Sequence, residues 1–249
     1  MPSNSRHRRR WVLSGVAALV MAVAIVVGAL LWRGVLQLNG RSASSYSVKG
    51  VDVSSYQGTI DWSVLASQNI DFAFIKATEG SSSVDSRFKA NWAGAEKAGV
   101  IAGAYHFFSF ETPGATQAAW FIQNVPRRQG MLPPVADVEW YNQFTRHPPA
   151  KQDVVTQLQD FLDALEAAYG VKPIIYCSES MLRDYLGSFS DYPIWIRNII
   201  SVPRLPAHRT WTFWQYSSTT QLKGYKGSQK FVDMNVFNGS LEDLEALLA

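Results

Sequence analysis

The chain has 249 residues, of which 47% are hydrophobic and 13% are aromatic, an ordinary globular composition that suits one large domain or two small ones. The formal net charge is only +3, and Arg6, Arg8, Arg9 and Arg10 supply that excess, so the remainder is close to neutral. Such a short basic tail argues against a nucleic-acid partner and favours a topology signal ahead of a membrane segment.

The first predicted element is a membrane-spanning helix over residues 11–32. This stretch carries no charged residue and has Trp11 and Trp32 at its ends. At about 1.5 Å per residue it is roughly 33 Å long, which matches the hydrocarbon core of a bilayer. Because the arginines before it outnumber Arg33 after it, we expect residues 1–10 to form a cytoplasmic tail. The chain is then a single-pass protein of the bacterial inner membrane, with the remainder in the periplasm. A cleaved signal peptide is the alternative, which the length of the apolar run disfavours.

The next two features concern the exported part of the chain. Residues 33–48 are rich in Gly, Ser and Asn and poor in apolar residues, and we expect them to be a linker. Cys177 is the only cysteine, so no intrachain disulfide can form and the domain must depend on its hydrophobic core. Since Cys177 ends the apolar run Ile174–Cys177, the pattern indicates a small buried residue and not a nucleophile.

Residues 49–249 show short apolar runs that alternate with amphipathic segments, and we expect them to form one catalytic barrel domain. Eight runs predict strands, at residues 50–54, 72–78, 101–108, 133–140, 173–178, 192–198, 212–217 and 231–236. Helices are predicted between the earlier runs, at residues 85–98, 113–125, 151–169 and 179–186. The later runs are joined by segments rich in Pro, Gly, Ser and Thr that cannot hold a crossover helix.

This order predicts an α/β fold, an irregular TIM-like (β/α) barrel with about five βα units and three closing strands, some of them antiparallel. Active sites of such barrels lie where the carboxyl ends of the strands converge. Polar residues at strand ends are therefore the candidates for chemistry.

Asp137 and Glu139 are the most informative of these residues, because they end a short apolar run that should be largely buried. Side chains two residues apart in a strand project to the same side, with Cα atoms about 6.5–7 Å apart. Two close carboxyls cannot both ionise cheaply, so one keeps its proton while the other stays anionic. That combination suits cleavage of a glycosidic bond. The alternative is a solvated acidic strand end.

Other predicted strand ends are also polar. They carry Asp52, Lys76, Glu79, Tyr105, His106, Trp214, Gln215, Tyr216 and Asp233. Several acids at one mouth would be costly unless the site used them. For His106 we prefer a satisfied core histidine and for Lys76 an ion pair with a nearby acid, while the aromatic residues suit the apolar face of a sugar ring. Spacings typical of a metal site, a P-loop or a dinucleotide fingerprint are missing, so we expect no cofactor and no metal.

Six linked motifs resemble glycoside hydrolase family 25, the muramidases of the Chalaropsis lysozyme type. In the order of the family they are Gly50–Gly58 (GVDVSSYQG), Phe74–Gly80 (FIKATEG), Gly103–Phe107 (GAYHF), Asp137–Glu139 (DVE), Trp214–Ser217 (WQYS) and Val232–Asn235 (VDMN). The resemblance implies an irregular β/α barrel. It also implies hydrolysis of the β-1,4 bond between N-acetylmuramic acid and N-acetylglucosamine in peptidoglycan.

The resemblance implies that Glu139 is the general acid and Asp137 its anionic partner. It leaves open whether the acetamido group of the substrate attacks the anomeric carbon, Asp137 attacks it directly, or water attacks with inversion. Asp52 and Asp233 match the remaining acids of the family's site, and Glu79, Tyr105, Trp214, Gln215 and Tyr216 are expected to bind substrate. We expect a monomer that acts on peptidoglycan glycan strands. Two alternatives are a non-catalytic module that binds wall glycan and a chitin-directed glycosidase.

Overall fold

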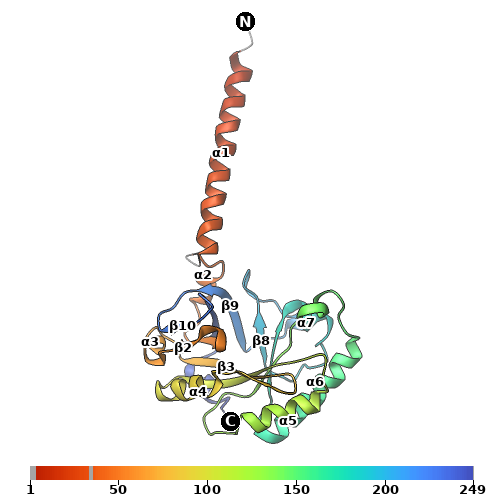
Figure 1. Cartoon of the computed structure of the whole chain (residues 1–249). Coiled ribbons are helices and arrows are strands. Elements are labelled where there is room, and N and C mark those ends of the chain that lie inside the picture. Colours follow the sequence, from red (N-terminus) through yellow and green to blue (C-terminus); the bar gives the residue numbers. More distant parts are fainter. Residues whose placement is uncertain (1–3, 34–35, 249) are drawn as a thin grey trace.

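The computed structural model describes residues 4–33 and 36–248, and it shows a long helix attached to one barrel domain (Figure 1). The helix α1 (Asn4–Trp32) contains an apolar stretch, Trp11–Leu31, with a mean hydropathy of 2.6, and no part of it is buried. By length and composition this helix can cross a membrane.

The eight predicted strands are all present and form a closed barrel. They are β1 (Lys49–Val53), β3 (Phe72–Glu79), β5 (Ile101–Phe107), β6 (Val135–Asp137), β7 (Ile174–Ser178), β8 (Ile194–Arg197), β9 (Phe213–Thr220) and β11 (Val232–Phe237). The order around the wall is β1-β11-β9-β8-β7-β6-β5-β3, and β1 pairs with β3 to close it. Neighbouring wall strands are parallel except where β11 pairs with β1 and β9. The α/β barrel expected from the sequence is therefore confirmed.

Five of the strands are each followed by a helix, which agrees with the expected number of βα units, although the first of these helices is not among the four predicted from the sequence. The helices are α3 (Trp62–Ala66), α4 (Phe88–Lys97), α5 (Gly114–Asn124), α6 (Lys151–Tyr169) and α7 (Glu179–Asp184). The last strands are connected by loops that contain the 3-10 helix η3 (Pro206–His208) and strand β10 (Tyr225–Lys226), which pairs with β2 (Thr59–Ile60). The remaining elements are α2 (Gly40–Ala43), η1 (Ser55–Gln57), β4 (Ser83–Val84), η2 (Asn142–Thr145) and α8 (Leu241–Glu245).

Helix α6 shows how the apolar pattern fixes the outer layer. Its residues Leu158, Phe161 and Leu165 recur at three- and four-residue spacing, and all are fully buried. The helix ends at Gly170, whose φ of 74° is a left-handed conformation that glycine adopts without strain. Gly114 of α5 lies so close to α6 that a Cβ atom there would be 1.7 Å from the carbonyl oxygen of Gln157. Glycine is therefore required where the two helices touch.

Aromatic and aliphatic side chains fill the inside of the barrel below its mouth. Phe72, Phe74, Trp195 and Phe213 belong to this inner cluster, and the rings of Phe74 and Trp195 stack with centroids 4.4 Å apart. Leu244 of α8 packs into the same cluster. The interior is consequently a packed core, and the cavity that the described barrel strands enclose lies at the carboxyl ends of the parallel strands.

The segment after α1 differs from the expected linker. Val48 is buried, and the Asn39 side chain donates to the carbonyl oxygens of Asn198, at 3.0 Å, and Tyr216, at 3.4 Å. The ring of Tyr46 packs against Trp211, with centroids 5.1 Å apart. The described part of the segment, from residue 36 to residue 48, is thus attached to the outside of the barrel, because these contacts join it to residues far away in the sequence.

Candidate active site

A cavity of about 260 Å³ lies at the mouth of the barrel. Six of the residues predicted for the site line it, namely Asp52, Tyr105, Asp137, Glu139, Gln215 and Asp233. The lining also includes Lys76, Tyr176 and Trp195, so acids, amides and aromatic rings face one space. Such a mixture is suited to a polar ligand that also has apolar faces.

Asp137 and Glu139 line the same cavity, as their spacing in the sequence predicts. Strand β6 is shorter than expected and ends at Asp137, so Glu139 lies just beyond it. The backbone is nevertheless held on both sides, because Phe108 N donates to Asp137 O at 2.9 Å and Val138 N donates to Tyr176 O at 2.9 Å. The two carboxyls therefore project from a chain segment that neighbouring strands fix.

Both carboxyls of this pair bind protons more tightly than ordinary acids. Burial raises the pKa of Asp137 well above its ordinary value, and the charge of Glu139 adds to the effect. Burial also raises the pKa of Glu139, while the positive charge of Arg197 opposes the rise. Asp137 is only 6% exposed, and its Oδ1 atom has no hydrogen-bond partner among the described residues. In the free protein Asp137 is therefore the carboxyl on which a proton is most favoured, and it also offers an unsatisfied acceptor.

A second acidic pair, Asp52 and Asp233, faces the first pair across the mouth. The two residues are direct partners in the β1–β11 ladder. Asp52 Oδ2 accepts hydrogen bonds from Gln215 Nε2 at 2.9 Å and from Asn235 Nδ2 at 2.8 Å. The same nitrogen of Gln215 lies 3.4 Å from Asp233 Oδ2. Two side-chain amides are thus directed at the acidic pair, and the positive charge of Arg197 also lowers the pKa of both carboxyls.

The two amides oppose the rise in the pKa of Asp52 but do not cancel it. Burial raises the pKa of Asp52, while the hydrogen bonds from Asn235 and Gln215 lower it. Burial and the charge of Asp52 raise the pKa of Asp233 to about 8. Near neutral pH, Asp233 accordingly carries a proton for much of the time and Asp52 is the better anion.

Aromatic residues form the walls and floor of the cavity. Tyr105 lines the cavity from β5, and burial together with the nearby acids raises its pKa well above the ordinary value, so it stays a neutral hydrogen-bonding group. The hydroxyl of Tyr176 donates to Gln215 Oε1 at 2.9 Å, and Trp195 Nε1 donates to Asn235 Oδ1 at 2.7 Å. Both amides that screen Asp52 are therefore held in place by aromatic residues.

Tyr176, as a site residue, is absent from the sequence prediction. It lies in an apolar run that indicates only a buried strand. Tyr176 can be identified as a site residue only from the parallel pairing of β6 with β7, which places Tyr176 directly beside Asp137. That register is a property of the folded sheet, so the sequence alone did not reveal it.

Three residues predicted to bind substrate do not line the cavity. Trp214 is fully buried, donates from Nε1 to Asn198 O at 2.8 Å and packs against Trp211 and Tyr46, so it belongs to the outer side of the wall. Tyr216 lies on the same side, because residues two apart in β9 share a face. Glu79 reaches the cavity only through Lys76, with which it forms an ion pair at 2.7 Å.

The two interpretations preferred for Lys76 and His106 agree with the structure. Lys76 pairs with Glu79, although it also lines the cavity. His106 is fully buried, with Nδ1 2.7 Å from Thr78 Oγ1 and Nε2 3.0 Å from Gln117 Oε1. Burial lowers its pKa to about 4, so it is a neutral core histidine.

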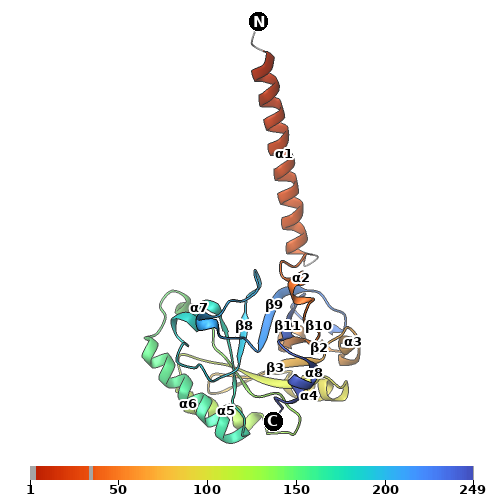
Figure 2. The ribbon, with the colours of Figure 1, turned by 180° about the vertical axis from the view of Figure 1, so that it is seen from behind.

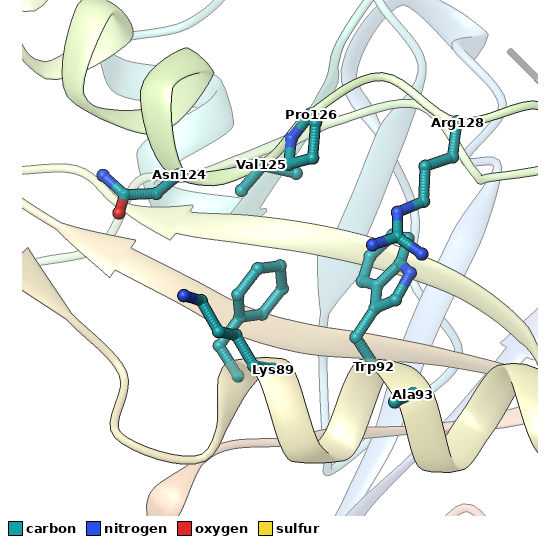
Figure 3. Close-up of a pocket in the computed structure, with 8 residues that line it drawn as sticks. Lys89, Trp92, Ala93, Asn124, Val125, Pro126 and Arg128 are labelled. Carbon is teal, nitrogen blue, oxygen red and sulfur yellow. The ribbon is translucent and has the colours of Figure 1, made fainter.

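A second cavity, of about 250 Å³, lies on the outside of the barrel between α4 and the segment that follows α5 (Figure 3). Trp92, Val125 and Pro126 give it an apolar lining, and Lys89 and Arg128 are its basic residues. Arg128 is paired with Glu96 at 3.2 Å. Since the two cavities are nearly equal in volume, size does not distinguish them, but only the cavity at the mouth contains carboxyl groups that could donate a proton.

Comparison with known proteins decides the family. Residues 51–225 match the model of glycosyl hydrolases family 25. The chain belongs to this family. It is therefore a glycoside hydrolase of the lysozyme and muramidase kind, as the six motifs indicate.

Individual relatives agree with this assignment. The chain is 37% identical to lysozyme M1 of Streptomyces globisporus over 223 residues, which cover 82% of this chain and 72% of the relative. It is 30% identical to the N,O-diacetylmuramidase of a Chalaropsis species, over 81% of this chain and 99% of that one. A solved family 25 structure from Bacillus anthracis superposes with a TM-score of 0.77 at 47% identity, over 81% of this chain and 94% of that one. The family 25 barrel of this chain is thus shown by sequence and by shape.

Proposed function

We propose that this family 25 enzyme hydrolyses the β-1,4 bond between N-acetylmuramic acid and N-acetylglucosamine in peptidoglycan, with Glu139 as the general acid. The observation that carries the proposal is the pairing of a buried Asp137 with Glu139 in the cavity at the mouth. The raised pKa of each carboxyl supports a site that still holds a proton near neutral pH. The names of the relatives, which include lysozyme and N,O-diacetylmuramidase, support the choice of substrate.

Substrate binding would have to move the proton from Asp137 to Glu139. The unsatisfied Oδ1 atom of Asp137 offers an acceptor for the N–H of a sugar acetamido group. A hydrogen bond from that N–H stabilises the anionic form of Asp137 and lowers its pKa. With Asp137 ionised, its negative charge raises the affinity of Glu139 for the proton. Glu139 then protonates the leaving oxygen while Asp137 orients the acetamido group.

The unsatisfied Oδ1 acceptor of Asp137 supports attack by the acetamido oxygen on the anomeric carbon over direct attack by Asp137. A carboxylate that accepts the acetamido N–H increases the negative charge on the acetamido oxygen, which is the atom that would form the new bond. Direct attack by Asp137, or inversion through a water molecule, would not use a hydrogen bond from the acetamido N–H to Asp137. Loss of activity on a substrate that lacks the acetamido group is the result expected from this proposal.

The second acidic pair and the aromatic residues are proposed to hold the sugar. Asp52 and Asp233 can accept from sugar hydroxyls, and Gln215 is positioned by Tyr176 to keep Asp52 ionised. Tyr105 and Trp195 supply ring surface for the apolar face of a pyranose. The site is complete within one chain, which supports action as a monomer.

We further propose that α1 anchors the barrel in the inner membrane with the active site in the periplasm. The apolar stretch Trp11–Leu31 is long enough to span the hydrocarbon core, and the arginines precede it. An enzyme that cleaves the cell wall must have its active site on the same side of the membrane as the wall. The proposed orientation meets this requirement.

The decisive experiment compares Glu139→Gln with wild type on purified peptidoglycan. Glutamine has the shape of a protonated carboxyl but donates no proton, so turnover should fall by at least about 100-fold. Glu245→Gln, an exposed change in α8, is the matched control and should retain activity. Release of reducing ends measures the rate, and mass spectrometry of the fragments identifies the new end. Near-normal turnover of Glu139→Gln would refute its role as the acid.

The same assay, with chitin oligomers added as a second substrate, separates the muramidase from a glycan-binding module and from a chitin-directed enzyme. Glycan binding without cleavage over long incubation would indicate a binding module. Faster cleavage of chitin oligomers than of peptidoglycan would indicate a chitin-directed enzyme.

A further inference from the structure

The end of helix α1 lies beside the carboxyl ends of β8 and β9, on the side of the barrel where the mouth opens. Leu31 and Leu36 share a small cavity with Ile199, which follows β8, and with Ser217 to Thr219 of β9. Gln37 Nε2 donates to Thr220 Oγ1, the last residue of β9, at 2.5 Å. Strands β8 and β9 are parallel, and both end at the mouth. In both views α1 leaves the domain at one end and the carboxyl terminus lies at the other (Figures 1 and 2), and Figure 2 shows α8 near that terminus.

The chain between the helix and the barrel is short. Five residue steps separate Trp32, the end of α1, from Gln37, the first residue with a hydrogen bond to β9. An extended chain covers at most about 18 Å in five steps. If α1 crosses the bilayer, the mouth side of the barrel must therefore remain close to the membrane surface.

Exposed apolar side chains are concentrated at this same end. Outside α1, eight large hydrophobic residues of the described chain are exposed, and four of them are here: Ile200 (72%), Leu38 (62%), Val202 (42%) and Leu36 (41%). We call these four residues the apolar rim. The other four, Tyr56, Val64, Val84 and Leu241, are spread over different elements. A cluster of this kind beside a membrane helix is a surface that lipid can cover.

The loop that carries Ile200 is held in shape and cannot easily fold its apolar residues inward. Asn198 Oδ1 accepts from the backbone of Ile200 at 3.0 Å and of Ser201 at 2.9 Å. The carbonyl oxygen of Asn198 also accepts from Asn39, so the loop and the segment after α1 are joined at one residue. Exposed arginines, Arg33, Arg41 and Arg204, accompany the rim and can contact anionic headgroups.

We propose that the apolar rim is a membrane-docking surface that inserts into the bilayer crossed by α1. Docking at both α1 and the Ile200 loop fixes the barrel with its mouth directed toward the membrane surface. The glycan that enters the cavity is then glycan close to the bilayer, such as strands still attached to a lipid at one end. This assignment of substrate rests on the proposed function, whereas the docking itself does not.

The first test measures contact with lipid and needs no catalysis. Full-length protein with Ile200→Cys is labelled with a fluorophore and placed in vesicles of phosphatidylethanolamine and phosphatidylglycerol that contain a nitroxide-bearing lipid. Leu241→Cys, exposed at the opposite end, is the matched control, and wild type, whose Cys177 is buried, gives the background. We expect at least about threefold more quenching at position 200, as for a side chain in the interface. Equal quenching at positions 200 and 241 would overturn the proposal.

The second test measures what docking does for the substrate. The double variant Ile200→Ser, Val202→Ser in vesicles should lose severalfold in rate on glycan strands attached to lipid in the same membrane. Its rate on soluble glycan fragments should equal that of wild type, because neither residue lines the cavity. An equal loss on both substrates would show that the loop supports the active site and not docking. If wild type cleaves neither substrate, the proposed function fails while the quenching result still decides the docking.

Discussion

Replacing Asp233 with asparagine should stabilise the barrel, although it changes a residue of the candidate active site. Burial and the charge of Asp52 raise the pKa of Asp233 to about 8. In the unfolded chain the same carboxyl titrates near 3.8. A raised pKa means that stability is fully present below about pH 4 and is lost as the pH rises toward 8, because the folded state resists ionisation. Asparagine has the same shape and never ionises.

The expected size of the effect follows from this displacement. A shift from 3.8 to about 8 is roughly 4 pH units, and at about 1.4 kcal/mol per unit the full penalty above pH 8 is on the order of 5 kcal/mol. Part of the penalty is repulsion by Asp52, which is relieved when Asp52 takes the proton instead. We therefore expect Asp233→Asn to gain about 1–3 kcal/mol at pH 8, or roughly 2–12 °C in Tm for a domain of this size.

The assay is thermal unfolding of residues 36–249 between pH 5 and pH 8. The gain of Asp233→Asn over wild type should increase with pH. Asp243 supplies the control, because hydrogen bonds from Ser240 lower its pKa. Asp243→Asn should therefore lose stability or leave it unchanged, and should never gain it. A gain for Asp233→Asn as large at pH 5 as at pH 8, or a lower Tm at pH 8, would refute the reasoning.

Three further changes test other parts of the molecule. Burial lowers the pKa of His106 to about 4, so wild type should lose roughly 3 kcal/mol as the pH falls from about 6.5 to about 4, and His106→Gln should flatten that slope in urea titrations. Trp214→Phe should cost about 1–3 kcal/mol in stability and leave KM for peptidoglycan unchanged, because the ring lies outside the cavity; a raised KM would contradict this. Tyr176→Phe frees the amide of Gln215 and leaves its buried oxygen without a donor, so kcat/KM should fall by about tenfold and stability by about 1–3 kcal/mol. A loss of stability with unchanged kcat/KM would indicate a purely structural role.

Much of the fold could be predicted because local pattern and global arrangement agree. Short apolar runs separated by turn residues predict the strands, and the structure contains all eight. The spacing of Leu158, Phe161 and Leu165 predicts α6 with its observed bounds. The rule that barrel chemistry lies at the carboxyl ends of strands then selects Asp52 and Asp137, which do meet at the mouth.

The errors arise where long-range packing decides. In the motif Trp214-Gln215-Tyr216, alternation allows either Gln215 or the two aromatic residues to face the mouth, but not all three. The structure turns Gln215 inward and buries Trp214 outside against Tyr46. The segment over 36–48 lacks a strong apolar pattern, yet single contacts such as that of Asn39 with Asn198 fix it to the barrel. Such contacts join residues distant in sequence, so no local pattern reveals them.

The direction of β11 explains both why two aspartates meet at the mouth and why their charges reduce the stability of the fold. Asp52 and Asp137 lie at the carboxyl ends of parallel strands, whereas Asp233 is the second residue of its strand. In a parallel barrel that position would lie at the closed end. Because β11 is antiparallel, its beginning lies at the mouth, and its register sets Asp233 opposite Asp52. Adjacent partners in a ladder cannot move apart, so when both are ionised their repulsion is screened by Gln215 and Asn235 and is relieved only when one of them takes a proton. Any change that relieves it, such as Asp233→Asn, must therefore also alter the acidic mouth.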